Sequence, residues 1–155
     1  LDGSDLAAKI LPQIEDLAKT CKSEKITLIT AGNVPTNEDL SYEGLDKYAA
    51  AIRAEAEKKL SAYEAEMKAK GLNADSVYLE GEPAQAILDY ATDNGYDLIS
   101  MATHGRGEMA WVIGSVAERV AAHATMPVLL MRVMEFGQAI TKKDYWAMDV
   151  GEPLA

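Results

Sequence analysis

A glycine-rich stretch, THGRGEMAWVIGS over Thr103 to Ser115, holds the residues best suited to chemistry in this chain. Gly105, Gly107 and Gly114 allow backbone N–H groups to approach an anion without an intervening Cβ, and Arg106 adds a positive charge. A predicted helix follows, and its N-terminus offers unpaired N–H groups with partial positive charge. The stretch therefore predicts a phosphate-binding loop.

Two common phosphate-binding loops do not fit this stretch. A Walker loop requires a lysine immediately before its Ser or Thr, whereas Ser115 follows Gly114. The segment GRGEMA, Gly105 to Ala110, formally matches a dinucleotide fingerprint, but the helix does not begin within it and no acidic residue ends the next strand, PVLLMR. We therefore expect neither a Walker site nor an NAD site.

The polar side chains around the stretch favour support of the backbone over catalysis. His104 has no carboxylate or nucleophile at a useful spacing, so we expect it to support the loop. Ser115 and Glu118 form the Ser-x-x-Glu pattern of a capping box, a role for Ser115 that is compatible with phosphate contact. His123 ends its predicted helix, where a cation is favourable. No catalytic residue is assigned.

Composition limits the classes of partner. The chain has 155 residues, the size of one domain, and no apolar run approaches the ~20 residues of a membrane span. Its net charge of −10 disfavours nucleic acid. A single cysteine, Cys21, excludes an internal disulfide, and no Cys/His cluster has zinc spacing. We expect a soluble, cytoplasmic protein with no structural metal and no membrane partner.

Strands and helices alternate along the chain. Apolar spacing predicts a helix at Ser4 to about Thr20, with a bend at Pro12, and a second helix at 45–70 with Gly71 as its C-cap. A third helix is predicted within 83–95, where Gly95 lies just past its end, and a fourth at 115–123. Short apolar runs predict strands at 25–30, 75–81, 97–103 and 126–132. The alternating charges of Arg53 to Lys70 predict a solvated helix face.

This alternation predicts an α/β fold: a doubly wound parallel five-stranded sheet of order 3-2-1-4-5 with helices on both faces. The sequence opens on LDGS, which is typical of the turn just after a strand, with Ser4 as a helix cap. We infer that the first strand lies upstream of Leu1. Because that strand is central in this order, its absence would leave the sheet split.

The chain changes character near its end. Residues 1–132 form the predicted domain, whereas 133–155 lose all periodicity but keep Phe136, Tyr145 and Trp146. This tail is either a poorly ordered terminus or an arm whose aromatic side chains dock on the body or on a second subunit. The last strand, Pro127 to Arg132, is predicted at a sheet edge, where an exposed apolar strand favours a homodimer.

Several segments together resemble the universal stress protein family. They are DGS near the start, EGEPAQAIL after the second strand, YDLISMATHGRG, and GSVAERVAAHATMPVLLMR. Nucleotide-binding members of that family carry Gly-x2-Gly-x9-Gly-Ser/Thr at the position of the glycine-rich stretch. The likeness covers most of the chain, apart from the tail after Arg132 and the loop near Val34.

The resemblance implies an α/β fold of the adenine-nucleotide α-hydrolase type, which holds ATP, or AMP or ADP, at the ends of the parallel strands, with or without Mg²⁺. By this resemblance, Asp2 would contact the ribose or adenine, and the backbone of Ala31 would meet the adenine edge. Ala102 and Gly105 would line the sugar and phosphates. The phosphates would be bound by Gly114, Ser115 and Val116 and, on charge alone, by Arg106.

The resulting expectation is a stress-linked binding or signalling module for ATP or a related adenine nucleotide, with slow or no hydrolysis. Two differences from the family pattern favour an alternative, a dimeric interaction scaffold that binds no nucleotide: Ala102 replaces a glycine, and eight residues rather than nine separate Gly105 from Gly114. A further alternative is an ATPase or nucleotidyl-transfer enzyme that uses His104 or Arg106.

Overall fold

The computed structural model describes residues 1–33, 42–103 and 113–133. Its helices are α1 (Asp5–Ala8), α2 (Leu11–Cys21), α3 (Tyr42–Ala69), α4 (Pro83–Asp93) and α5 (Ser115–His123). Its strands are β1 (Ile26–Gly32), β2 (Ala74–Glu80), β3 (Ile99–Ala102) and β4 (Val128–Met131). The predictions for His104, Gly105, Arg106 and the aromatic tail lie outside the described residues.

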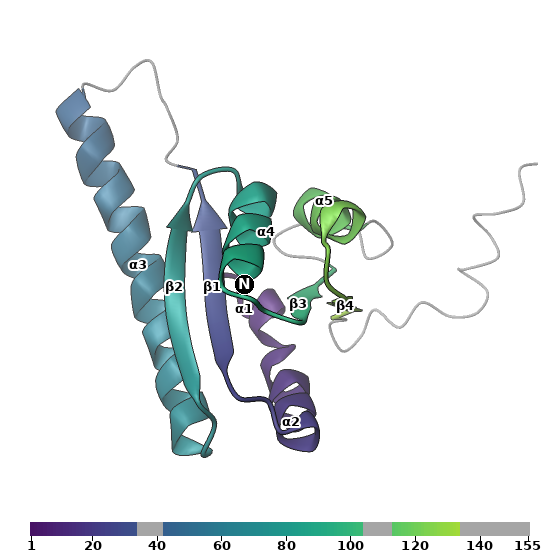
Figure 1. Ribbon diagram of the computed structural model, residues 1–155. Helices are drawn as coiled ribbons and strands as arrows, with labels where there is room; N and C mark the ends of the chain where they lie inside the picture. Colours follow the sequence, from purple (N-terminus) through teal and green to yellow (C-terminus); the bar gives the residue numbers. More distant parts are fainter. Residues whose placement is uncertain (34–41, 104–112, 134–155) are drawn as a thin grey trace, which may run out of the picture.

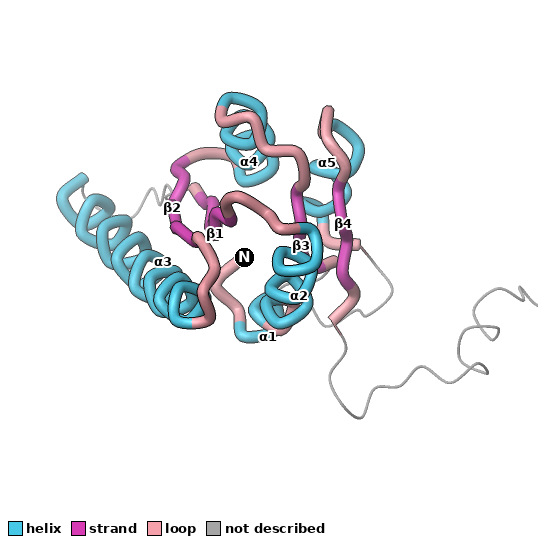
Figure 2. The backbone as a smooth tube through the Cα atoms, turned by 60° about the horizontal axis from the view of Figure 1, so that its bottom comes forward, coloured by secondary structure: helices cyan, strands magenta, loops and turns pink. Residues whose placement is uncertain are grey.

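The helices form a layer on each side of the strands. In Figures 1 and 2, α4 and α5 cover one face, and α1, α2 and α3 cover the other. The first layer packs around the buried residues Ala84, Ala91, Ile99 and Val120. The second packs around Leu11, Leu28, Leu60, Met67 and Ala74. No described helix is both long and apolar enough to cross a bilayer.

All strand pairs among the described residues are parallel, as predicted. β1 pairs with β2 from Ile26 with Ala74, and β3 pairs with β4 from Ile99 with Val128. These pairs make two separate two-stranded sheets rather than one sheet. The chain start lies between β1 and β3 in both views (Figures 1 and 2), and the Leu1 ammonium donates to the carbonyl of Ile29 at 2.8 Å.

The first helical segment differs from its prediction. The expected single helix with a bend is two helices, because α1 ends at Ala8 and α2 begins at Leu11. Pro12 lies in the first turn of α2, where its missing N–H is not needed; within a continuous helix its ring would clash with the carbonyl four residues earlier. Ser4 caps α1 as predicted, since its Oγ accepts from the N–H of Ala7 at 3.1 Å.

The ends and the outer face of the other helices follow the sequence signals. Gly71 and Gly95 adopt φ of +83° and +68° just past α3 and α4, the left-handed conformation that glycine tolerates best. The solvated face predicted for α3 is confirmed by ion pairs between residues four apart, namely Arg53–Glu57, Glu55–Lys59, Glu64–Lys68 and Glu66–Lys70.

Candidate functional site

The N-terminus of α5 is joined directly to the end of β3. The N–H of Gly114 donates to the carbonyl of Thr103 at 2.8 Å, and the N–H of Thr103 donates to the carbonyl of Met131 on β4 at 2.9 Å. Thr103 is buried. The structure therefore brings Ala102, the last residue of β3, together with the predicted phosphate-binding residues Gly114 and Ser115.

Gly114, not Ser115, occupies the N-cap position of α5. Its φ and ψ are −59° and 145°, Ser115 is the first helical residue, and the cap has no side-chain hydrogen bond. The capping-box prediction for Ser115 and Glu118 is therefore wrong, because a serine one position inside the helix does not take the N-cap role. Ser115 is exposed, so its hydroxyl lies at the surface beside the cap.

The space around Gly114 explains why glycine suits this position. A Cβ there would lie 3.3 Å from the carbonyl oxygen of Thr103, closer than ordinary van der Waals contact. Helix geometry leaves the first N–H groups of α5, from Ser115 onward, without partners inside the helix. The side chain of Val116 packs on the buried cluster around Val120, so Val116 has only its backbone to offer an anion.

Ala102 is compatible with the glycine position that it takes in the family pattern. It belongs to β3 and pairs with Met131. Among the described residues other than glycine, only Lys22 has a positive φ, so Ala102 keeps a backbone that any residue adopts. Ala31 lies near the carboxyl end of β1, paired with Leu79, and Gly32 after it accepts a hydrogen bond from the N–H of Gly81 at 3.2 Å.

Asp2 lies in a tight turn ahead of α1. Its Oδ1 accepts from the N–H of Ser4 at 2.9 Å and from the Ser4 hydroxyl at 2.5 Å, so Asp2 stabilises this turn. Gly3, at the middle of the turn, has a φ of +77°. From α3, the Lys59 ammonium donates to the Gly3 carbonyl at 2.9 Å. The turn is thus stabilised by Ser4, the N-cap of α1, and by Lys59 of α3.

Charged groups link the N-terminal halves of α4 and α5. Glu82, the N-cap of α4, accepts from the N–H of Gln85 at 2.8 Å and from the Arg119 guanidinium at 2.7 Å. The bond from Gln85, helped by Arg119, lowers the pKa of Glu82 and keeps it ionised. Glu118 is exposed in the first turn of α5, where its charge modestly opposes an anion at the cap. Local sequence patterns do not indicate the Glu82–Arg119 pair, which spans 37 positions.

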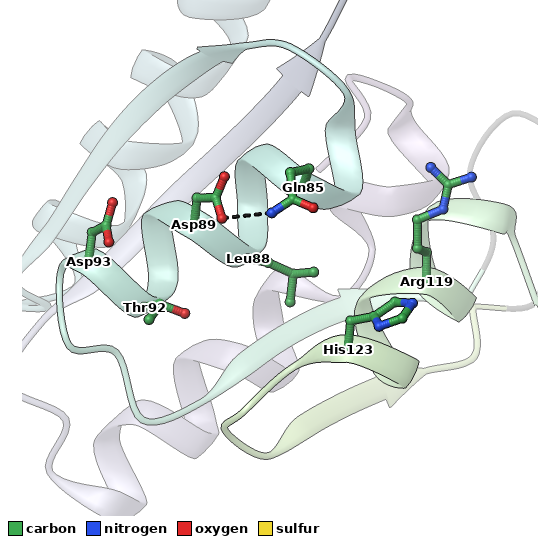
Figure 3. A pocket seen from close by; sticks show the side chains of 7 residues that line it. All are labelled: Gln85, Leu88, Asp89, Thr92, Asp93, Arg119 and His123. Atoms are coloured by element: carbon green, nitrogen blue, oxygen red, sulfur yellow. Dashed lines mark hydrogen bonds between the residues drawn. The ribbon is translucent and has the colours of Figure 1, made fainter.

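A separate groove runs between α4 and α5 (Figure 3). Its lining residues are Gln85, Leu88, Asp89, Thr92, Asp93, Arg119 and His123. None of the predicted nucleotide-binding residues that the structure describes lines it. His123 ends α5 as predicted, and within residues 1–33, 42–103 and 113–133 no group of three or more acidic, histidine or cysteine side chains is placed to hold a metal ion.

Parallel strands covered by helices on both faces, with the first helical turn of α5 joined to the end of β3, define an α/β protein. The family model of the universal stress protein family matches residues 1–132. The chain therefore belongs to the universal stress protein family, and the resemblance found in the sequence is confirmed.

Individual relatives support this assignment. Universal stress protein YxiE of Bacillus subtilis is 30% identical over 141 residues, covering 85% of this chain and 95% of the relative. The solved structure of MJ0577 from Methanocaldococcus jannaschii aligns with a TM-score of 0.74 at 26% identity, covering 87% of this chain and 92% of that chain.

Two more distant structures share the fold. A universal stress protein in complex with cAMP aligns with a TM-score of 0.57 at 21% identity, over 86% of this chain and 93% of that chain. The universal stress protein of Archaeoglobus fulgidus in complex with dAMP aligns with a TM-score of 0.55 at 21% identity, over 82% and 88%.

Proposed function

We propose that this protein binds ATP or a related adenine nucleotide and acts as a stress-response binding or signalling module, with slow or no hydrolysis. One observation carries the proposal: the N-terminus of α5 is capped by a glycine without a side-chain partner and is fastened to the end of β3 by the Gly114–Thr103 hydrogen bond. Such an end presents backbone N–H groups and partial positive charge to a phosphate.

The proposed contacts follow the chemistry of each part of the nucleotide. The Asp2 carboxylate accepts hydrogen bonds from ribose or adenine, and the backbone of Ala31 meets the adenine edge. The sugar and phosphates lie against β3 and α5, with Mg²⁺ carried on the phosphate oxygens when ATP binds. The proposed residues on that side are Ala102, Gly114, Ser115 and Val116, together with Gly105 and Arg106 outside the described residues.

The relatives solved with cAMP and dAMP support an adenine nucleotide as the ligand class. The negative φ of Ala102 also supports binding over the scaffold alternative, because a left-handed alanine there would cost about 1–2 kcal/mol.

Amide spectra test the proposal residue by residue. Titrating ¹⁵N-labelled protein with 5′-AMP should shift the amide signals of Ala31, Ser115 and Val116 in a saturable way. The amides of Lys19 and Ala69, on helices away from these strand ends, serve as internal controls. Equal shifts at all positions, or none, would refute the proposed site.

We also propose a homodimer formed through the edge strand Pro127 to Arg132. Support comes from β4, which pairs with β3 on one side and with no other described strand. An unpaired strand edge favours pairing with a second copy around a twofold axis. Sedimentation velocity of the protein should give the mass of two chains, and a monomer at micromolar concentration would contradict the dimer.

We further propose a fifth strand in the sheet, a docked C-terminal arm and a cytoplasmic location. A fifth strand between β1 and β3 would complete the order 3-2-1-4-5, and the Leu1–Ile29 hydrogen bond is the contact expected of such a strand. Residues 133–155 form an arm whose aromatic side chains dock on the 1–132 domain or on the partner subunit. The protein works in the cytoplasm, which suits the exposed free thiol of Cys21.

A further inference from the structure

Lys59 is a cation from the middle of α3 that reaches the chain start. Its ammonium donates to the Gly3 carbonyl at 2.9 Å, a contact between positions 56 apart. It also lies 4.0 Å from the carboxylate of Glu55, one helical turn away. The side chain is 43% exposed, so it lies partly against the body of the protein. The charge pattern of α3 alone predicts an ordinary solvated lysine here.

The Gly3 carbonyl belongs to the turn that presents Asp2. The left-handed backbone of Gly3 turns the chain, and Asp2 and Ser4 close it with two hydrogen bonds. Both Ser4 bonds are made to one oxygen of the Asp2 carboxylate, Oδ1, so they couple the carboxylate to the turn. The direction of the whole Asp2 carboxylate therefore depends on how firmly this turn is held.

We propose that Lys59 is a positioning residue for the ribose end of the nucleotide site. It fixes the Gly3 carbonyl, and through the turn it fixes the direction in which Asp2 meets the ribose or adenine. Lys59 itself touches no ligand. This inference rests on the proposed function, and it predicts that Lys59 acts on the nucleoside part of the ligand, independently of the number of phosphates.

Two matched variants of neighbouring lysines on α3 test whether Lys59 affects nucleotide binding. We expect Lys59→Met to weaken 5′-AMP binding roughly five- to tenfold, less than the direct loss of one hydrogen bond from a charged donor, because Lys59 acts through the turn. Lys58→Met removes the same charge from an exposed neighbouring position and should stay within about twofold of the wild type. Lys59→Arg keeps a charged donor and should recover most of the affinity.

A double variant separates positioning from direct attraction. In an Asp2→Asn background, Lys59→Met should cause little further loss, because Lys59 acts through Asp2. The Lys59→Met factor should also be equal for AMP and ATP. An additive loss, or a loss that grows with the number of phosphates, would overturn positioning and indicate direct electrostatic attraction.

The ligand-free protein gives an independent readout. Lys59→Met should shift the amide signals of Gly3 and Ser4, whereas Lys58→Met should leave them in place. Unchanged amides in Lys59→Met, or wild-type AMP affinity in that variant, overturns the inference while the proposed function stands. If the wild type binds neither AMP nor ATP, the proposed function fails and this inference fails with it.

Discussion

Replacing Gly114 with aspartate should separate stability from binding. The φ and ψ of Gly114, −59° and 145°, are those of an ordinary N-cap, and aspartate is among the best N-cap residues. The gain over glycine is only a few tenths of a kcal/mol. The new Cβ, 3.3 Å from the Thr103 oxygen, costs a similar amount. We expect the free energy of unfolding to change by less than about 0.5 kcal/mol, and Tm by less than about 2 °C.

The same substitution should abolish tight nucleotide binding. A carboxylate about 4 Å from a phosphate repels it by about 4 kcal/mol at an effective dielectric constant of about 20. Salt and exposure at the surface reduce this to about 2 kcal/mol, or roughly a thirtyfold loss of affinity. The new side chain also accepts hydrogen bonds from N–H groups of the first turn of α5 that the phosphate needs.

Fluorescence titration with a labelled ATP, alongside thermal unfolding, checks both expectations. Gly114→Asn is the matched control, because it caps the helix without the charge, and it should lose less affinity than Gly114→Asp. The difference between the two variants measures the electrostatic part. Wild-type ATP affinity in a folded Gly114→Asp protein would refute the reasoning that the phosphate lies at the N-terminus of α5.

Three further perturbations test the fold and the assembly. Val120→Ala, at a fully buried position, should lower the free energy of unfolding in urea by about 2 kcal/mol. Ile52→Ala removes one carbon more, but its position is 36% exposed, so it should lower the free energy by under about 1 kcal/mol. Equal losses would contradict the assigned core. Burial raises the pKa of Asp75, but hydrogen bonds led by that from Lys25 outweigh it and lower the pKa below 3.8. Ionised Asp75 therefore stabilises the folded protein above pH 3.8, and this stabilisation is lost as the pH falls through the folded pKa. Asp75→Asn should flatten the acid side of a plot of unfolding free energy against pH. An unchanged plot would contradict this. The N–H groups of Ile99 and Thr103 donate to the carbonyls of Pro127 and Met131, so these β4 residues face β3 and the N–H of Leu130, between them, points to the open edge. Leu130→Pro should therefore leave the fold intact and give a monomer in sedimentation velocity. A persisting dimer would exclude dimerisation through this edge.

Local signals in the sequence predicted most of the elements. Gly71 and Gly95 end their helices as expected because only glycine adopts the left-handed conformation cheaply. The capping pattern of Ser115 was misleading, because Gly114 immediately before it takes the N-cap position and leaves serine as the first helical residue. The bend expected at Pro12 divides the segment into two helices, because Lys9 and Ile10, which lie between α1 and α2, donate hydrogen bonds three residues back instead of four.

Contacts between distant positions were beyond the reach of local patterns. Lys59 follows Glu55 at the spacing of an exposed helical ion pair, and nothing in that spacing indicates the Gly3 carbonyl. Glu82 likewise has the form of a simple helix cap, whereas Arg119 reaches it from another helix. Such pairings depend on how α3, α4 and α5 pack, which a single sequence does not encode in any one segment.

Isothermal titration of ATP with Mg²⁺ into the protein tests the central claim most directly. We expect saturable binding of about one ATP per chain, with the heat lost in folded Gly114→Asp protein. Absence of heat across several temperatures, with the protein shown to be folded by circular dichroism, would contradict nucleotide binding and favour the dimeric scaffold.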